Sequence, residues 1–247
     1  MEKIAIALLL FVLLIIFLGV WGLPQIITEI TPTVTKPTTT TTVTIPHRGV
    51  ALKVPAVDAE GNGVVTTLLV EAQPGQGRVL TDVNNLLFWI DTQYSIRVAQ
   101  RVAQNITTVN VSNVDLIYAI ETNASLIEGP SAGAALTVAT IAALENKNLN
   151  QSVMITGTIN PNGSIGAVGA VAEKAKASKD VGATLFLVPE GQGTEINYKP
   201  VQKCEKIGPI LYCTTKYQTE KIDISKSVGI TVKEVSTVDE ALKYFLI

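Results

Sequence analysis

The sequence of 247 residues has little histidine and little cysteine. It contains one histidine, His47, and two cysteines, Cys204 and Cys213. A zinc site takes three or four ligands, usually His and Cys, so the chain cannot supply an ordinary one. A Ser-His-Asp or Cys-His hydrolase needs a histidine inside its folded domain, whereas His47 lies in a segment rich in Thr and Pro. The common metal-dependent and histidine-dependent hydrolases are therefore excluded.

An excess of charge of one sign is also missing. The 19 Lys and Arg are scattered and stand against 21 Asp and Glu, for a net charge of −2. With no basic field to attract it, nucleic acid is not an expected partner. No G-x-x-x-x-G-K-[ST] run occurs, so ATP hydrolysis by a P-loop is not encoded in this sequence. We expect neither a metal nor another cofactor.

One long hydrophobic run is present, at the N-terminus. Residues 4–27 contain no charged side chain, and about 20 apolar residues span a bilayer as a helix. Lys3 precedes the run, and Trp21 lies where an interfacial aromatic is common. We predict a transmembrane anchor over residues 1–27. A cleaved signal peptide is the alternative, although Gly19-Val20-Trp21-Gly22 is a poor cleavage site.

Residues 28–48 form a predicted linker, most of it rich in Thr and Pro. This composition cannot bury a core and is typical of an extended stalk, often O-glycosylated outside the cell, or of a plain flexible linker. Five N-x-[ST] sequons follow it. Cys204 and Cys213 could form a disulfide on an oxidising face or remain free thiols. We expect a single-pass membrane protein whose folded domain lies outside the cytoplasm.

Residues 49–247 are predicted to form one α/β (α+β) domain. Strands are expected over 64–72, 114–120, 152–159, 164–167, 183–188 and 230–235, and helices over 84–103, 131–144, 168–179 and 237–246. The turn Asn160-Pro161-Asn162-Gly163 should join 152–159 and 164–167 as a hairpin. Thr237 is the expected N-cap of the last helix. Residues from about 190 to 227 are predicted to be an irregular, polar insertion.

The hexapeptide Glu128-Gly129-Pro130-Ser131-Ala132-Gly133 is the first candidate for chemistry. Gly129 and Pro130 force a tight turn just before a helix, which places Ser131 at the helix N-terminus. Backbone N–H groups there favour negative charge and could hold an oxyanion, with Gly129, Pro130 and Ala132 as the residues of the turn and oxyanion site. The structural alternative is that Ser131 is only an N-cap.

A serine nucleophile requires a base, and with histidine excluded a neutral lysine is the usual remaining choice. Lys174 follows a run of small apolar residues, 165–172, in which burial would lower its pKa. Lys53 has a partly apolar setting too, but on a predicted edge strand. The alternative for Lys174 is a solvated helix lysine beside Lys176 and Lys179.

These segments resemble the proteolytic domain of Lon proteases, and most of all its archaeal membrane-associated branch. The resemblance rests on residues 128–133, on Thr156-Gly157 and on residues 165–174, and it extends over most of the folded domain. Ser131 and Lys174 stand 43 positions apart, as in that family. Pro130 departs from the acidic residue of the archaeal branch.

The resemblance implies that Ser131 is the nucleophile, that Lys174 is the base and that the Thr156 hydroxyl orients the lysine. Glu128 matches an acidic position that could modulate the protonation of the lysine; alternatively, its charge only stabilises the following helix N-terminus. The family fold is α/β, with a homo-hexameric ring as a possible assembly.

Lon proteases couple this domain to an ATPase that unfolds substrates, whereas here an anchor and a stalk take that place. We therefore expect an ATP-independent, membrane-anchored serine endopeptidase that hydrolyses unfolded or flexible polypeptides. One alternative is a catalytically inactive binding or assembly module. Another is the proteolytic subunit of a two-component ATP-dependent protease.

Overall fold

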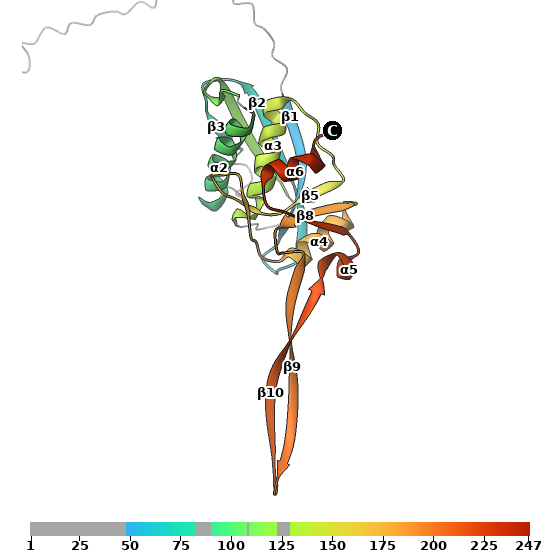
Figure 1. Cartoon of the computed structure of the whole chain (residues 1–247). Coiled ribbons are helices and arrows are strands. Elements are labelled where there is room, and N and C mark those ends of the chain that lie inside the picture. The colour runs from blue at the N-terminus through green and yellow to red at the C-terminus, as the bar shows by residue number, and fades with distance from the viewer. Residues whose placement is uncertain (1–47, 83–89, 108, 123–128) are drawn as a thin grey trace, which may run out of the picture. The chain divides into compact units, whose positions relative to one another are not determined.

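The computed structural model describes residues 48–82, 90–107, 109–122 and 129–247 (Figure 1). The expected anchor, the linker before residue 48 and Glu128 lie outside these residues, so the predictions about them stay predictions. None of the described helices is long and apolar enough to cross a bilayer. The described residues all belong to one unit, Thr44–Ile247.

The larger sheet has the strand order β1-β2-β4-β3. Its strands are β1 (Arg48–Val57), β2 (Gly63–Pro74), β3 (Val79–Thr81) and β4 (Val114–Glu121). β2 pairs antiparallel with β1 and β4, whereas β3 runs parallel to β4. Along β2 buried side chains alternate with partly exposed ones, as in a sheet with one face on a core. The strands predicted over 64–72 and 114–120 are confirmed, and Lys53 is exposed on the edge strand β1.

The second sheet is parallel, in the order β11-β8-β5. It contains β5 (Val153–Ile155), β8 (Leu185–Pro189) and β11 (Thr231–Val235), and a separate short hairpin pairs β6 (Thr158–Ile159) with β7 (Ile165–Gly166). The prediction of one continuous strand over 152–159 is therefore wrong, because only its second part belongs to the hairpin. The strand is interrupted at Thr156-Gly157, where the main chain of Gly157 bonds to Ser131 and Ala134 instead of to a strand.

The described helices are α2 (Ile90–Thr107), α3 (Gly133–Glu145), α4 (Val171–Asp180), α5 (Ile224–Val228) and α6 (Val238–Phe245), with 3-10 turns η1 (Val111–Asn113) and η2 (Pro130–Ala132). The helices predicted over 131–144, 168–179 and 237–246 are confirmed, with α4 beginning later than expected. The Thr237 side chain accepts a hydrogen bond from the Glu240 N–H, as predicted for an N-cap. The helix predicted over 84–103 is described from Ile90 onward.

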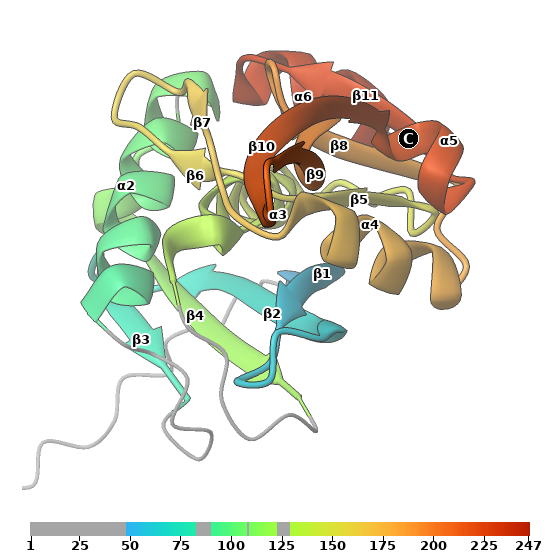
Figure 2. The same cartoon turned by 90° about the horizontal axis from the view of Figure 1, so that it is seen from below.

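Helix α3 lies at the centre of the domain. Every residue from Gly133 to Leu144 is buried, as expected for a helix that is apolar on all sides. It packs on β1 and β2 and against α2 and α6, and α4 packs on the same two strands (Figure 2). The two helices nearest to the predicted site residues are thus fixed to one pair of strands.

Residues 194–223 form a long antiparallel ribbon that projects from the domain (Figure 1). Its strands are β9 (Thr194–Ile207) and β10 (Ile210–Asp223), and α5 follows directly. The prediction of an irregular segment is therefore wrong. Cys204 and Cys213 lie opposite each other in the ribbon and form a disulfide, which decides between the two alternatives for these cysteines.

Candidate active site

Ser131 and Lys174 line the same cavity of about 390 Å³. The cavity lies between the turn that leads into α3 and the loop that leads into α4. Its walls are formed by Val57, Gly129, Pro130, Ser131, Thr158, Ala167, Val168, Gly169, Ala170 and Lys174. Apart from Ser131, Thr158 and Lys174, this lining is made of glycine, proline and apolar residues. A serine and a lysine far apart in sequence thus share one largely apolar site.

The turn before α3 presents Ser131 at the start of the helical segment. Gly129 has a φ of 103°, which side-chain-bearing residues rarely adopt, and Pro130 opens the 3-10 turn η2. Ser131 is partly exposed to solvent. No side chain caps η2 or α3, and the residues at the two N-cap positions are Gly129 and Ala132. The alternative interpretation of Ser131 as an N-cap is therefore wrong, and its hydroxyl remains available for chemistry.

The main chain of Ser131 is hydrogen-bonded to the segment between β5 and β6. Its carbonyl oxygen accepts hydrogen bonds from the Gly157 N–H, at 3.0 Å, and from the Thr156 hydroxyl, at 3.4 Å. Gly157 in turn accepts a bond from the Ala134 N–H, at 3.0 Å. Buried Thr156 thus orients the nucleophile turn, and its hydroxyl is not placed on the Lys174 amine as the family resemblance implied.

Lys174 is buried in the first part of α4, and only 3% of it is exposed, whereas Lys176 and Lys179 on the same helix are exposed. The interpretation of Lys174 as a solvated helix lysine is therefore wrong. Burial lowers the pKa of its amine from 10.5 to about 8, and the nearby Glu173 opposes this change. A tenth or so of the amines are then neutral at pH 7, which suits a general base.

The amine of Lys174 donates a hydrogen bond to the Gly169 carbonyl oxygen, at 3.1 Å. Ala170, between this carbonyl and α4, has a left-handed backbone with a φ of 56°. Such a conformation costs a non-glycine residue about 1 kcal/mol or more and is frequent at functional sites. It helps to set the orientation of the Gly169–Ala170 peptide, whose carbonyl receives the amine. Both Ser131 and Lys174 are described, and their side chains do not hydrogen-bond each other; the Gly169 bond holds the amine in the shared cavity.

Gln192 fixes the same wall of the cavity and was not predicted from the sequence. Its side-chain oxygen accepts the Val168 N–H at 2.9 Å, and its side-chain nitrogen donates to the Val168 carbonyl at 2.7 Å. One side-chain amide thus pairs with both main-chain groups of Val168, as a neighbouring strand would. Gln192 lies between β8 and β9, two residues before β9, so the ribbon begins just after this contact.

We expect Gln192→Ala to lower peptidase turnover about three- to tenfold. Two hydrogen bonds worth roughly 1 kcal/mol each are lost, and the segment from Ala167 to Ala170 is released near the lysine. In Gln192→Glu the bond to the Val168 N–H can persist, but a carboxylate oxygen would face the Val168 carbonyl, so we expect a loss at least as large as in Gln192→Ala. Steady-state hydrolysis across pH would measure both, because a displaced wall also moves the apparent pKa of the rate profile. Equal activity of Gln192→Ala and wild type would show that the contact has no role in positioning.

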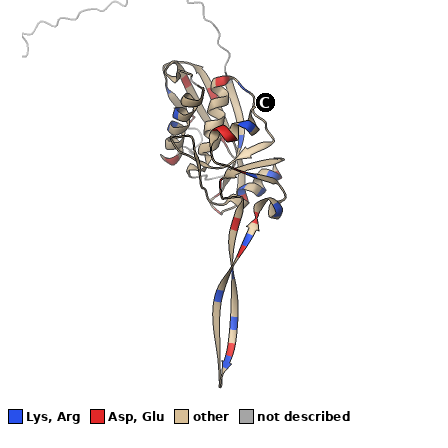
Figure 3. Cartoon of the chain, viewed as in Figure 1, with Lys and Arg blue, Asp and Glu red and all other residues tan. Residues whose placement is uncertain are grey.

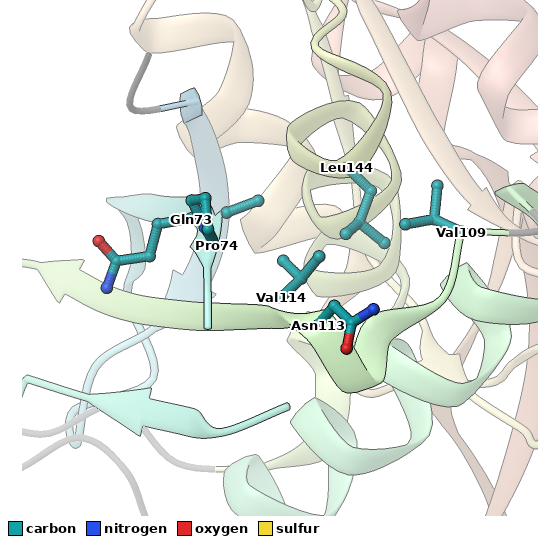
Figure 4. Close-up of a pocket in the computed structure, with 7 residues that line it drawn as sticks. Gln73, Pro74, Val109, Asn113, Val114 and Leu144 are labelled. Carbon is teal, nitrogen blue, oxygen red and sulfur yellow. The ribbon is translucent and has the colours of Figure 1, made fainter. Parts of the chain in front are cut away.

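A second cavity, of about 180 Å³, contains no candidate nucleophile or base (Figure 4). It is lined by Ala72, Gln73, Pro74, Val109, Asn113, Val114 and Leu144. The side chains of Val109, Val114 and Leu144 converge on one another in it. Its lining offers packing surface and no acid–base chemistry, so the candidate active site is the cavity of Ser131 and Lys174.

Comparison with known proteins gives matches to Lon proteases. Residues 80–215, more than half of the chain, match the Lon protease (S16) C-terminal proteolytic domain. The archaeal Lon protease of Thermoplasma volcanium is 30% identical over 147 residues, which cover 58% of this chain and 21% of that protein. The archaeal Lon protease of Methanocaldococcus jannaschii is 26% identical over 187 residues, which cover 68% of this chain and 28% of that protein. The Lon protease of Clostridium acetobutylicum is 31% identical over 139 residues, which cover 54% of this chain and 18% of that protein. The matched part spans less than a third of each of these relatives.

Proposed function

Because the chain belongs to the Lon protease (S16) C-terminal proteolytic-domain family, we propose that it is a serine endopeptidase with Ser131 as nucleophile and Lys174 as general base. The shared cavity carries the proposal, since it contains both a partly exposed serine and a buried lysine. A serine hydroxyl is a weak nucleophile until a nearby base takes its proton. A lysine with a pKa of about 8 can do so near neutral pH.

In the proposed reaction, neutral Lys174 accepts the proton of Ser131 Oγ as this oxygen attacks the scissile carbonyl. The negative charge that develops on the carbonyl oxygen is stabilised by the backbone N–H groups of Ser131 and Ala132 in η2, because those of Gly133 and Ala134 already bond to the Pro130 and Gly157 carbonyls. The C–N bond then breaks, and Lys174 gives its proton to the leaving amine. Water attacks the acyl-enzyme with Lys174 again as base, which regenerates Ser131. Thr156 and Gly157 act by holding the Ser131 main chain.

We also propose that the enzyme is anchored in a membrane by residues 1–27, faces the outside of the cytoplasm and works without ATP. The apolar run and the Thr/Pro-rich linker support the anchor. The Cys204–Cys213 disulfide supports an oxidising compartment. ATP hydrolysis by a P-loop is not encoded in residues 1–247, and independence from ATP is the part of the proposal that the assay below tests directly. Without an unfolding motor, substrates would be unfolded or flexible polypeptides.

The test is hydrolysis of unfolded casein and of short fluorogenic peptides by the full chain in detergent, with and without ATP. We expect equal rates in both conditions and no cleavage by Ser131→Ala. Because the base must be neutral, kcat/KM should rise about tenfold per pH unit up to roughly pH 8 and then level off. A rate that required ATP and a partner ATPase would favour the two-component alternative. No turnover, together with no labelling of Ser131 by a fluorophosphonate, would favour the inactive binding module.

Membrane sidedness needs a separate measurement in intact cells. If the domain faces outward, added protease should remove the folded domain from whole cells. Full protection until the cells are lysed would place it on the cytoplasmic side.

A further inference from the structure

The two faces of the β9–β10 ribbon differ in chemistry. In an antiparallel pair, residues opposite each other point to the same face. One face carries Ile196, Tyr198, Pro200, Leu211, Tyr217 and the disulfide, and we call it the apolar face. Between the cross-strand pairs Ile196–Lys221 and Lys206–Leu211 this face carries no charged side chain. The other face, which we call the charged face, carries the ion pairs Lys199–Glu220 and Lys203–Glu205. Its charged residues are interspersed with exposed apolar side chains: Val201, Ile207, Ile210 and Tyr212.

The apolar face is open to solvent. The large side chains Ile196, Tyr198, Leu211 and Tyr217 are from 51% to 69% exposed. Within the described part of the chain, β9 and β10 pair only with each other, so the outer edge of each strand is also unpaired. Isolated two-stranded ribbons are marginally stable in water, and exposed apolar surface of this kind usually marks an interaction site.

Charge disfavours a lipid surface as the partner. Along the ribbon lysines are interspersed with acidic residues, and both signs are visible over its length (Figure 3). Amphipathic segments that bind anionic membranes carry an excess of Lys and Arg on the polar face. On the charged face of this ribbon three lysines, Lys199, Lys203 and Lys216, stand against three glutamates, Glu195, Glu205 and Glu220. The ribbon therefore lacks the positive field that such membranes attract.

Size disfavours a second copy of the chain. Each strand has 14 residues, and at about 3.3 Å per residue the ribbon is roughly 45 Å long. With two strands, each face covers on the order of 450 Å², whereas a stable interface buries about 800 Å² per partner. A face that is long, narrow and rich in tyrosine suits a transient, sequence-tolerant contact with an extended chain. The free strand edges can add main-chain hydrogen bonds to such a chain.

The base of the ribbon is attached to the wall of the active-site cavity. Gln192, two residues before β9, bonds both main-chain groups of Val168, which lines that cavity. The Ile224 N–H closes the base by donating to the Gly193 carbonyl, at 3.1 Å. A polypeptide bound along the ribbon is therefore held on a segment that is continuous with the site of Ser131.

We propose that the apolar face of the β9–β10 ribbon is a docking surface for unfolded polypeptide, which it holds for cleavage at the Ser131 site. The inference rests on the proposed peptidase function for its purpose, but the binding itself requires no catalysis. The ribbon should bind unfolded polypeptides in preference to folded proteins. A folded protein offers neither an extended main chain for the strand edges nor continuous apolar side chains for the apolar face.

The test measures binding to the full-length chain with Ser131→Ala, so that nothing is cleaved. The probe is fluorescein-labelled, reduced and carboxymethylated α-lactalbumin, an unfolded protein, and the readout is fluorescence anisotropy. We expect Tyr217→Ser to raise the Kd about three- to fivefold and the double variant Tyr198→Ser/Tyr217→Ser about tenfold. Tyr212→Ser is the matched control, because Tyr212 is a similarly exposed tyrosine on the charged face. Its Kd should change less than twofold.

Equal Kd values for Tyr217→Ser, Tyr212→Ser and the parent would overturn the proposal, and near-ultraviolet circular dichroism checks that each variant is folded. A double variant that sediments as a smaller species than its parent would instead identify the ribbon as a contact between copies. Liposomes that protect the ribbon of the parent from added protease, but not that of the double variant, would identify a membrane contact. If the wild type cleaves no peptide while the apolar-face variants still weaken binding, the peptidase proposal fails and the docking surface stands.

Discussion

A chain in which methionine replaces Lys174 is expected to lose roughly a thousandfold in peptidase turnover and yet to unfold at a higher temperature. The loss of turnover follows from removal of the general base, which typically contributes 10²–10⁴-fold. The gain in stability follows because Lys174 is only 3% exposed as a residue, and a charged amine is costly to bury at neutral pH. Methionine has a similar length and no charge, so it can fill the same space.

The sign and size of the stability change follow from the pKa of Lys174, which burial lowers from 10.5 to about 8. Below about pH 8 the amine is protonated in both the folded and the unfolded chain, and the folded chain bears the full cost of burying the charge. Between about pH 8 and 10.5 the unfolded chain still binds a proton that the folded chain has released, so the stability of the wild type rises with pH. The cost below pH 8 is on the order of 3 kcal/mol, since a tenfold change in proton affinity is worth about 1.4 kcal/mol.

Loss of the bond to the Gly169 carbonyl offsets part of this gain, by roughly 1 kcal/mol. A net gain of about 2 kcal/mol should raise the Tm at pH 7 by roughly 5 °C for a domain of this size. Calorimetry at pH 7 and pH 10 measures it, and the difference between variant and wild type should shrink at the higher pH. Lys176→Met is the control, because Lys176 is exposed on the same helix and should change stability by less than about 0.5 kcal/mol. A lower Tm for Lys174→Met at both pH values would show that the amine is not the buried, destabilising base assigned to it.

The parts of the fold that were predicted correctly are those whose signals are local and whose side chains meet the core. β2 was predicted from its composition and turns, and its buried positions alternate as a half-buried strand requires. Helix α6 was predicted from its cap, since Thr237 bonds the Glu240 N–H. The burial of Lys174 was expected because the residues before it are small and apolar. At these positions the local sequence and the tertiary environment favour the same conformation.

The ribbon was missed because nothing covers it in the described chain. The usual strand signal is alternation between buried and exposed side chains, and it arises from contact with a core. Nearly every side chain of β9 and β10 is exposed. Lysines and glutamates are interspersed along its charged face, and Pro200 argues against a strand. The strand conformation of this segment is determined by the pairing of β9 with β10 and not by burial against a core.

Within the candidate site the sequence predicted the types of side chain but not their partners. The Ser131–Lys174 pair was assigned from the family resemblance, and the small apolar residues before the lysine were consistent with it. The contact of Gln192 with Val168 joins groups 24 positions apart and leaves no periodic trace in the sequence. The bond of Thr156 to the Ser131 carbonyl likewise depends on the interruption between β5 and β6. Side-chain to main-chain bonds of this kind follow from the completed fold, so local propensity cannot supply them.

Gly63→Ala should cost about 1–3 kcal/mol of stability and roughly a hundredfold in turnover, although Gly63 lies outside the cavity. A Cβ atom at this position would lie 2.2 Å from the Glu173 carbonyl oxygen and 2.8 Å from its carbonyl carbon. These are backbone atoms of α4 next to Lys174, so no side-chain rotation relieves the contact. The helix would have to move away from β2 by about 1 Å, and overpacking of this size costs about 1–3 kcal/mol. A displacement of about 1 Å in a catalytic group can cost 10²-fold in rate.

The matched control is Gly49→Ala. Gly49 also lies in the larger sheet, but a Cβ there meets only the Glu71 Cγ, at an ordinary contact distance of 3.7 Å. It should leave turnover unchanged and leave stability unchanged or slightly raised, because alanine has less freedom than glycine in the unfolded chain. Urea unfolding gives the stability of both variants, and hydrolysis between pH 6 and 10 gives their activity. If α4 moves as expected, Lys174 becomes better solvated and the rate profile of Gly63→Ala shifts to higher pH, towards the ordinary pKa of lysine. A profile that keeps its midpoint near pH 8, with full turnover, would mean that α4 does not depend on close packing at Gly63 to place its lysine.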